Sequence, residues 1–253
     1  MAEGRVALVT GATSGFGAAI TRRLLSDGWR VIATGRRQAR LDALAADAGP
    51  AVLPYVLDVT DTDGIAAMPA SLPAAWRSID ALINNAGLAL GLGPAAEADL
   101  RDWDRMVATN ITGLIHMTRA FLPGMVARNA GHVVNLGSIA ATYPYPGGHV
   151  YGASKAFVEQ FTLNLKADLV GTQVRVTNIE PGLCGGTEFS EVRFGDAARA
   201  ASVYQGTDPL TSEDIAEAIA WVVTLPPHVN INRIEMMPTC QAPASLAVKR
   251  RTP

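Results

Sequence analysis

Short hydrophobic runs alternate with longer segments of helical periodicity along almost the whole chain. The runs are apolar nearly throughout and rich in Val and Ile, which is typical of parallel strands covered on both faces. They occupy residues 5–10, 30–35, 51–57, 81–86, 132–138, 173–180 and 231–237. Segments with helical periodicity lie near residues 16–27, 38–47, 61–68, 100–128, 151–169 and 212–224.

This alternation predicts an α/β fold. We expect a single Rossmann-like, doubly wound parallel sheet of about seven strands with helices on both faces. No linker or internal repeat divides the chain, so residues 1–253 are expected to form one domain. Residues 182–211 are the least regular stretch and are interpreted as a substrate lid, because long connections in compact domains are usually functional. A C-terminal tail is expected from about residue 238.

A glycine-rich turn follows the first predicted strand. In VALVTGATSGFG, the residues Gly11, Gly15 and Gly17 stand between that strand and a helix rich in small residues. Glycines there permit a tight turn and a close approach of the backbone to a pyrophosphate at the helix N-terminus. The spacing differs from G-x-G-x-x-G, and the alternative is a turn without a ligand. Its position after the first strand favours a dinucleotide site.

The end of the second predicted strand indicates which dinucleotide is bound. NAD-binding units commonly place an acid about 20 residues after the glycines, where it binds the ribose 2′-OH. This chain has Gly35 at that position, followed by Arg36 and Arg37. Two guanidinium groups can bind a 2′-phosphate through charge-assisted hydrogen bonds. NADP is therefore the predicted cofactor, and a solvated basic turn is the alternative.

The sequence YGASK places a phenol and an ammonium four residues apart. On a helix, Tyr151 and Lys155 would lie on the same face. A nearby cation favours phenolate, so the lysine could lower the tyrosine pKa from its reference value of about 10. The alternative is a chance pair on a surface helix.

Composition excludes several classes of protein. The formal net charge of −2 over 253 residues argues against a nucleic-acid binder. No apolar stretch approaches the roughly 18–20 residues of a membrane span, and no signal peptide is expected. Cys184 and Cys240 are interpreted as free thiols of a cytoplasmic protein. The histidines show no ligand spacing, so no metal site is expected; they are His116, His132, His149 and His228.

Several motifs occur in a fixed order along the chain. They are TGATSGFG at 10–17, NNAG at 84–87, Asn110 in ATNITG, Ser138 in NLGSIA, YGASK at 151–155 and PG at 181–182. Together they resemble the short-chain dehydrogenases/reductases over essentially the whole chain. Longer segments resemble the NADP-dependent 3-hydroxy acid dehydrogenase branch of that family; they are GLALG, FLPGMVARN, EPGLCGGTEFSEVRF and NINRIEMMPT. His149 and Cys184 depart from that branch's pattern, which bears on the range of substrates.

The resemblance implies catalytic roles for four residues. Tyr151 would exchange a proton with the substrate oxygen while hydride moves between the substrate carbon and the nicotinamide. Lys155 would lower the pKa of that tyrosine and bind the nicotinamide ribose. Ser138 would hydrogen-bond the substrate oxygen, and Asn110 would help to hold a water that relays the proton to solvent.

The resemblance also implies a cofactor site, in which Asp58 contacts the adenine ring and the NNAG turn supports the cofactor. The expected cofactor residues are Gly11, Thr13, Ser14, Gly15, Phe16, Gly17, Arg36, Arg37, Asp58, Val59, Asn85, Ala86, Gly87, Tyr151, Lys155, Pro181 and Gly182. The implied substrate is a small 3-hydroxy acid or its semialdehyde: serine, allo-threonine, or 3-hydroxypropionate and malonic semialdehyde. A homotetramer is also implied, built through residues 100–128, 151–169 and the last strand.

The carboxylate of such a substrate requires a cation. Arg193 is the only basic residue of the lid segment GGTEFSEVRFGD, so we expect it to bind that carboxylate. Ser138 and Tyr151 are the expected substrate contacts at the reacting oxygen. The alternative is that Arg193 forms an ion pair with Glu191 or Asp196 on an exposed loop. His149 is a further candidate substrate contact, with loop packing as its alternative.

Glu180, at the end of a predicted strand, is expected to make a structural hydrogen bond or to contact a substrate ammonium. Two rival functions stay open. One is an NADPH-dependent reductase of another carbonyl, such as a ketoacyl thioester or a sugar-derived ketone, and the other is a non-catalytic NADP-binding protein.

Overall fold

The computed structural model describes residues 4–243, so most of the predicted tail lies outside the described residues. Seven parallel strands form one sheet in the order β3-β2-β1-β4-β5-β6-β7. This confirms the predicted Rossmann-like sheet. The strands are β1 (Val6–Thr10), β2 (Arg30–Gly35), β3 (Val52–Val56), β4 (Ala81–Asn84), β5 (Gly131–Leu136), β6 (Val174–Pro181) and β7 (Arg233–Met236).

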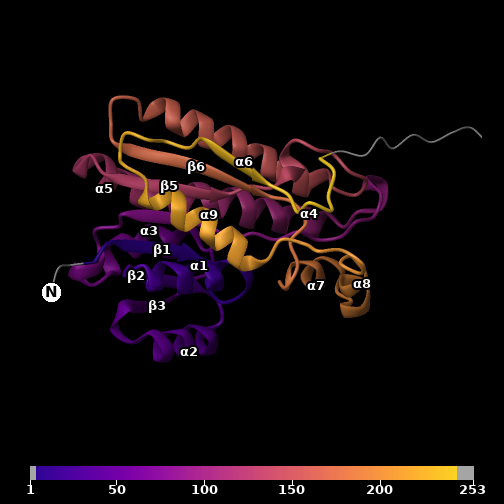
Figure 1. Ribbon diagram of the computed structural model, residues 1–253, viewed down its shortest axis with the longest axis horizontal. Coiled ribbons are helices and arrows are strands. Elements are labelled where there is room, and N and C mark those ends of the chain that lie inside the picture. The colour runs from indigo at the N-terminus through magenta and orange to yellow at the C-terminus, as the bar shows by residue number, and fades with distance from the viewer. Residues whose placement is uncertain (1–3, 244–253) are drawn as a thin grey trace, which may run out of the picture.

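Helices cover both faces of this sheet (Figure 1). One face packs against α1 (Gly15–Ser26), α2 (Gln38–Ala48) and α9 (Ser212–Thr224). The other packs against α3 (Thr62–Ser71), α5 (Leu114–Arg128) and α6 (His149–Asp168). None of the helices within residues 4–243 combines the length and the apolar character needed to cross a membrane.

The first strand shows why the strand sequences are apolar throughout. Ala7 and Val9 join the hydrophobic core under α1 and α9, whereas Val6 and Leu8 join the core under α3 and α5. Successive side chains of a strand point to opposite faces, and here each face carries a helical layer. Both sets are therefore buried, and no polar alternation remains in the sequence.

The predicted helix over 100–128 is interrupted. It consists of α4 (Leu100–Val107), a π-helical segment (Ala108–Gly113) and α5. A wider turn of this kind inserts one residue into the helix and is common at functional sites. Here it carries Asn110, whose side-chain amide donates to the Leu88 carbonyl oxygen at 2.8 Å and accepts from the Leu88 amide at 2.9 Å.

The segment 182–211, which we call the lid, contains the short helices α7 (Phe189–Phe194) and α8 (Ala197–Ser202). The two helices lie side by side at one end of the molecule (Figure 1). Backbone pairing closes the base of the lid, where the Gly185 amide donates to the Leu210 carbonyl and the Leu210 amide donates to the Leu183 carbonyl. The lid therefore leaves the sheet after β6 and returns to its starting point just before α9.

Candidate active site

The predicted site residues converge at the carboxyl ends of the strands. The strand order reverses between β1 and β4, and ligands of open α/β sheets bind at such a switch point. The turns that follow these two strands are joined there, because the Thr10 hydroxyl accepts hydrogen bonds from the backbone amides of Asn85 and Ala86, both at 2.9 Å. The glycine-rich turn and the NNAG turn thus form one surface.

Close packing requires glycine at two positions of the glycine-rich segment that follows β1. Gly11 has a φ of 67°, and a Cβ there would lie 3.0 Å from Nδ2 of Asn85. A Cβ on Gly17 would overlap the carbonyl of Gly11. The turn therefore exposes backbone at the N-terminus of α1, where Ser14 is the N-cap residue and makes no side-chain capping bond. This geometry suits a phosphate.

The acid expected to contact adenine, Asp58, follows β3. Its Oδ1 accepts hydrogen bonds from the Thr60 amide and hydroxyl, and its Oδ2 lies 3.6 Å from Nη1 of Arg36. Burial acts to raise the pKa of Asp58, but the hydrogen bonds from Thr60 and the charge of Arg36 outweigh it and hold the pKa below its ordinary value. Arg36 itself is exposed.

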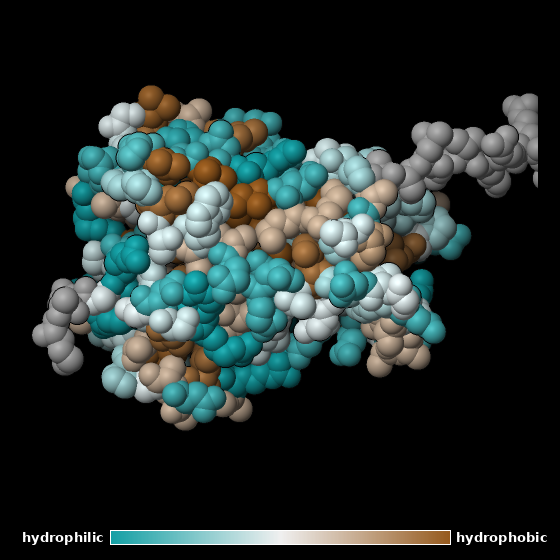
Figure 2. Space-filling view, in the orientation of Figure 1, coloured by the Kyte–Doolittle hydropathy of each residue, from teal (hydrophilic) through white to brown (hydrophobic). Residues whose placement is uncertain are grey.

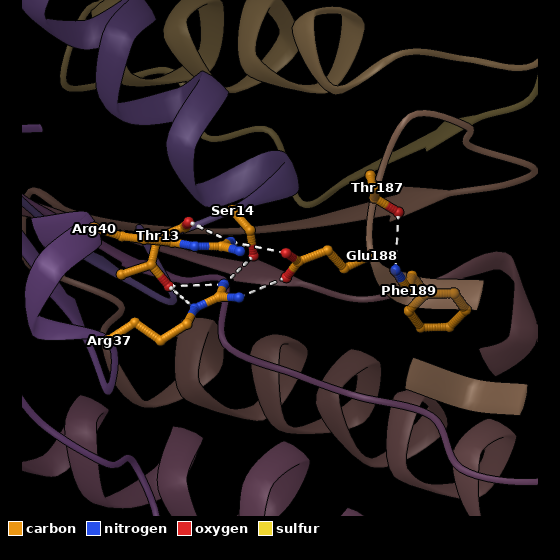
Figure 3. A network of polar contacts seen from close by, with 7 residues as sticks. All are labelled: Thr13, Ser14, Arg37, Arg40, Thr187, Glu188 and Phe189. Carbon is orange, nitrogen blue, oxygen red and sulfur yellow. Dashed lines mark hydrogen bonds and ion pairs between the residues drawn. The ribbon is translucent and has the colours of Figure 1, made fainter. Parts of the chain in front are cut away.

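Arg37 meets a different set of groups. Its guanidinium donates to the Thr13 hydroxyl at 3.0 and 3.1 Å, to the Ser14 hydroxyl at 2.7 Å and to the Glu188 carboxylate at 2.8 Å. Arg40 donates to the other oxygen of Glu188, also at 2.8 Å (Figure 3). The arginine hydrogen bonds lower the pKa of Glu188 to about 2. We call this group of Glu188, Arg37 and Arg40 the arginine clasp.

Sequence reasoning missed Arg40 and Glu188. The spacing of Arg37 and Arg40, three residues apart at the start of a predicted helix, could have indicated that the two side chains lie close together. No local signal connects either arginine with Glu188, which belongs to the lid. Close packing also favours glycine at position 35, because a Cβ on Gly35 would lie 2.8 Å from Cγ2 of Thr13.

Tyr151 and Lys155 are both on α6 and both buried, which argues against a chance pair on a surface helix. Nζ of Lys155 lies 5.8 Å from the centre of the Tyr151 ring and donates to the Leu136 carbonyl oxygen at 2.7 Å. Burial lowers the pKa of Lys155 to about 8. Burial also raises the pKa of Tyr151 to about 12, although a hydrogen bond with Ser138 opposes the increase. The pKa-lowering role of Lys155 stays a prediction for the complex with cofactor.

The other two predicted catalytic residues border the same space. Ser138 follows β5, and its hydroxyl also accepts from the Ala140 amide at 3.1 Å. Asn110 donates to the hydroxyl of Ser154, on the helix that carries Tyr151. Its Oδ1 and Nζ of Lys155 would each lie 3.4 Å from a Cβ added to Gly87. Gly87 thus keeps the space between Asn110 and Lys155 free of a side chain.

The lid brings Arg193 to this site. Arg193 donates to the Gly91 carbonyl oxygen at 3.1 Å and to the Tyr145 hydroxyl at 2.9 Å, rather than to the acids of its own loop. Its guanidinium lies 5.6 Å from the centre of the Tyr151 ring. His149 packs against Trp103 with a ring-centroid distance of 5.0 Å and contacts the Gly93 carbonyl, an arrangement that favours its loop-packing interpretation.

Two further predicted cofactor residues lie at the end of β6, where Pro181 is the last residue of the strand and Gly182 follows it. The amide of Gly182 donates to the Met236 carbonyl at 2.7 Å, which fixes Pro181 and Gly182 beside β7. Glu180 is fully buried; it accepts a 2.6 Å hydrogen bond from Asn178 and lies 3.5 Å from Nε of Arg233. The expected structural hydrogen bond is therefore present. Within residues 4–243, no group of three or more His, Cys, Asp or Glu side chains could hold a metal.

A switch-point sheet with a glycine-rich turn and a buried Tyr-Lys pair defines a dinucleotide-dependent dehydrogenase fold. The family model for short chain dehydrogenases matches residues 5–197. The chain belongs to the short-chain dehydrogenase family.

Individual relatives are similar over nearly the whole chain. The NADP-dependent 3-hydroxy acid dehydrogenase YdfG of Salmonella typhi is 61% identical, with 97% of this chain and 99% of the relative covered. The serine 3-dehydrogenase of Agrobacterium fabrum is 52% identical, with 97% and 98% covered. Among solved structures, the closed form of serine dehydrogenase complexed with NADP+ has a TM-score of 0.96 and 59% identity, covering 97% of this chain and 100% of that one.

Proposed function

We propose that this protein is an NADP-dependent oxidoreductase. It transfers hydride between NADP(H) and the 3-hydroxyl or 3-oxo group of a small 3-hydroxy acid. The observation that carries the proposal is the joint burial of Tyr151 and Lys155 beside Ser138, under a lid that contributes Arg193. The 3-hydroxy acid and serine dehydrogenases to which the chain is similar support the substrate class.

The residues present fit NADP. Backbone at the N-terminus of α1 would bind the pyrophosphate, and Asp58 would contact the adenine. Arg37 and the neighbouring Thr13 and Ser14 hydroxyls would bind the 2′-phosphate. When bound, the nicotinamide supplies the hydride acceptor or donor.

Tyr151 takes the proton of the substrate hydroxyl during oxidation and returns it during reduction. Ser138 hydrogen-bonds the reacting oxygen, which stabilises the charge that develops on it. Lowering the Tyr151 pKa from about 12 to neutrality requires roughly 7 kcal/mol of preferential phenolate stabilisation. Lys155 supplies part of it once its ammonium turns from Leu136 toward the phenolate and the nicotinamide ribose. Asn110 holds the water that carries the proton onward.

Arg193 binds the substrate carboxylate. Its position above the Tyr151 ring and its two contacts with residues outside the lid, Gly91 and Tyr145, support this role. A guanidinium makes a bidentate contact with a carboxylate, and such a contact sets the distance between the carboxylate and the reacting carbon. Substrates without a carboxylate would lack this orientation.

A cofactor-coupled screen tests the proposed function. Serine, allo-threonine, 3-hydroxypropionate and 3-hydroxyisobutyrate are offered with NADP+, beside a ketoacyl thioester and a sugar-derived ketone with NADPH. We expect the 3-hydroxy acids to react with a higher kcat/KM. Faster turnover of the thioester or the ketone would instead support the reductase of another carbonyl, and no turnover of any substrate would support the non-catalytic alternative.

We also propose a cytoplasmic homotetramer. The thiols of Cys184 and Cys240 are free, as expected in a reducing compartment. β7 ends the sheet, and α6 exposes Phe157, so both elements offer surface for a neighbouring subunit. On the face shown in Figure 2, hydrophobic side chains gather over the region that β6 occupies in Figure 1. Sedimentation velocity would test the assembly.

A further inference from the structure

The guanidinium of Arg37 is almost fully occupied by protein acceptors. Nε and Nη2 donate to the Thr13 hydroxyl, Nη2 also donates to the Ser14 hydroxyl, and Nη1 donates to Glu188. A guanidinium has five N–H donors. Four of these donors are therefore used, and a phosphate can make a bidentate contact with this group only by replacing one of the present acceptors.

Glu188 uses both carboxylate oxygens on arginines. Oε2 accepts from Arg37 and Oε1 accepts from Arg40, each at 2.8 Å, and the Ser14 hydroxyl lies close enough to help stabilise the charge. In Figure 3 each oxygen of the carboxylate faces one of the two guanidinium groups, Ser14 lies close to the carboxylate, and Thr13 lies on the opposite side of the Arg37 guanidinium. Two cations and the Ser14 hydroxyl around one anion form the kind of group that binds a phosphate monoester.

The acceptor in this group comes from the lid and not from the body of the domain. Glu188 immediately precedes α7, whereas Thr13, Ser14, Arg37 and Arg40 belong to the turns after β1 and β2 and to α2. The lid thus puts a carboxylate where Arg37 and Arg40 would meet the 2′-phosphate. A carboxylate and a phosphate dianion on the same guanidinium groups repel each other.

We propose that Glu188 is a specificity-determining residue that competes with the 2′-phosphate of the cofactor for Arg37 and Arg40. The lid carboxylate and the cofactor phosphate are alternative partners of the same two arginines. Only a cofactor that carries the 2′-phosphate can replace Glu188 on them, so NADP releases the arginine clasp and NAD does not. This inference rests on the proposed use of NADP.

The test uses two fragments that differ only in the phosphate at issue, 2′,5′-ADP and 5′-AMP. Their dissociation constants are measured by calorimetry on the full chain and on Glu188→Gln, which keeps the shape of the side chain and removes its charge. Each half-exposed ion pair contributes up to about fivefold to an equilibrium constant. We therefore expect Glu188→Gln to bind 2′,5′-ADP about 3- to 20-fold more tightly and 5′-AMP within about twofold of the unmodified protein.

Glu191→Gln is the matched control. It removes the same charge from a position three residues further along the lid, and among the described residues its carboxylate makes no hydrogen bond or ion pair with the arginine clasp. It should leave both dissociation constants within about twofold. A similar gain in Glu191→Gln would show that the net charge of the lid, and not competition at the arginines, is responsible.

Other outcomes would overturn the inference. Unchanged or weaker binding of 2′,5′-ADP to Glu188→Gln would mean that Glu188 orients the arginines or has no role. An equal gain for both fragments would mean that the substitution only loosens the lid. Equal affinity of the unmodified protein for 2′,5′-ADP and 5′-AMP would overturn the proposed NADP preference as well, so the two failures are distinguishable.

Discussion

The guanidinium of Arg193 lies 5.6 Å from the centre of the Tyr151 ring, and the same arginine hydrogen-bonds the Tyr145 hydroxyl. Arg193 comes from the lid helix α7, while Tyr151 is on α6. The relationship places a cation of the lid beside the proposed proton-transfer group. A substrate held between them would have its carboxylate at the arginine and its hydroxyl at the tyrosine.

We predict that Arg193→Met lowers kcat/KM for serine or 3-hydroxypropionate, with a loss of transition-state stabilisation of roughly 2–5 kcal/mol. The substitution removes one partner of the buried charge pair between Arg193 and the substrate carboxylate. Activity on an uncharged secondary alcohol should be nearly unchanged, since no carboxylate is involved. Tyr145→Phe is the control, because it deletes the hydroxyl that accepts from Arg193 and keeps the guanidinium. Steady-state kinetics that fall in parallel for charged and neutral substrates would mean that Arg193 only holds the lid in shape.

Tyr151→Phe should lower kcat by about 10²–10⁴-fold, because the ring remains and the exchangeable proton is lost. NADP+ affinity should change little, since the hydroxyl serves the substrate. Tyr143→Phe is a suitable control, because the Tyr143 hydroxyl contacts Glu235 and not the site. Turnover is measured with saturating NADP+ and the best substrate of the screen, and near-normal turnover by Tyr151→Phe would contradict the proton-transfer role.

A third prediction concerns cofactor choice. Gly35→Asp introduces the acid of NAD-binding units, but its Cβ would lie 2.8 Å from the Thr13 methyl group. We expect the single variant to lose at least about tenfold in kcat/KM for NADP+ through charge repulsion, without gaining NAD+ activity. Thr13→Ser removes that methyl group, so the double variant should use NAD+. Steady-state kinetics of both variants with NADP+ and with NAD+ test these expectations. Good NAD+ activity in the single variant would show that the Thr13 methyl group does not hinder the aspartate.

Glu180 should make the stability of the protein dependent on pH. Burial, with the neighbouring Glu159 and Glu235 charges, raises its pKa from 4.5 to about 7, against the effects of Arg233 and Asn178. The folded state therefore binds the proton more tightly than the unfolded chain. This contribution to the free energy of unfolding is complete below pH 4.5, declines as pH rises and is lost above about pH 7.

The Glu180 contribution to the free energy of unfolding is predicted to fall by on the order of 3 kcal/mol as the pH rises. Glu180→Gln cannot lose a proton, so its free energy of unfolding should not show this decline between pH 5 and 8. Urea unfolding of both proteins across that range, at one protein concentration, measures the difference. Identical pH profiles would show that Glu180 keeps its ordinary pKa in the folded protein.

The sequence by itself determined the class of fold and the family. Continuous apolar runs such as Val6–Val9 can be buried on both faces only in a sheet covered by helices on both sides. The glycine turn, the spacing of Tyr151 and Lys155 and the basic pair after Gly35 are local features, so they are readable without coordinates. The matching family model and the parallel sheet confirm these predictions. The single domain and the individual site roles stay predictions.

Only the tertiary structure decided the features that depend on distant contacts. Burial sets the pKa of Tyr151. That burial results from the packing of several elements, and no local sequence pattern encodes this packing. The helix over 100–128 is broken at Asn110, whose amide bonds the backbone of Leu88. Glu188 lies 151 and 148 residues beyond the two arginines that it binds. Charge pairing across such separations depends on where the fold places the lid, so sequence spacing could not reveal it.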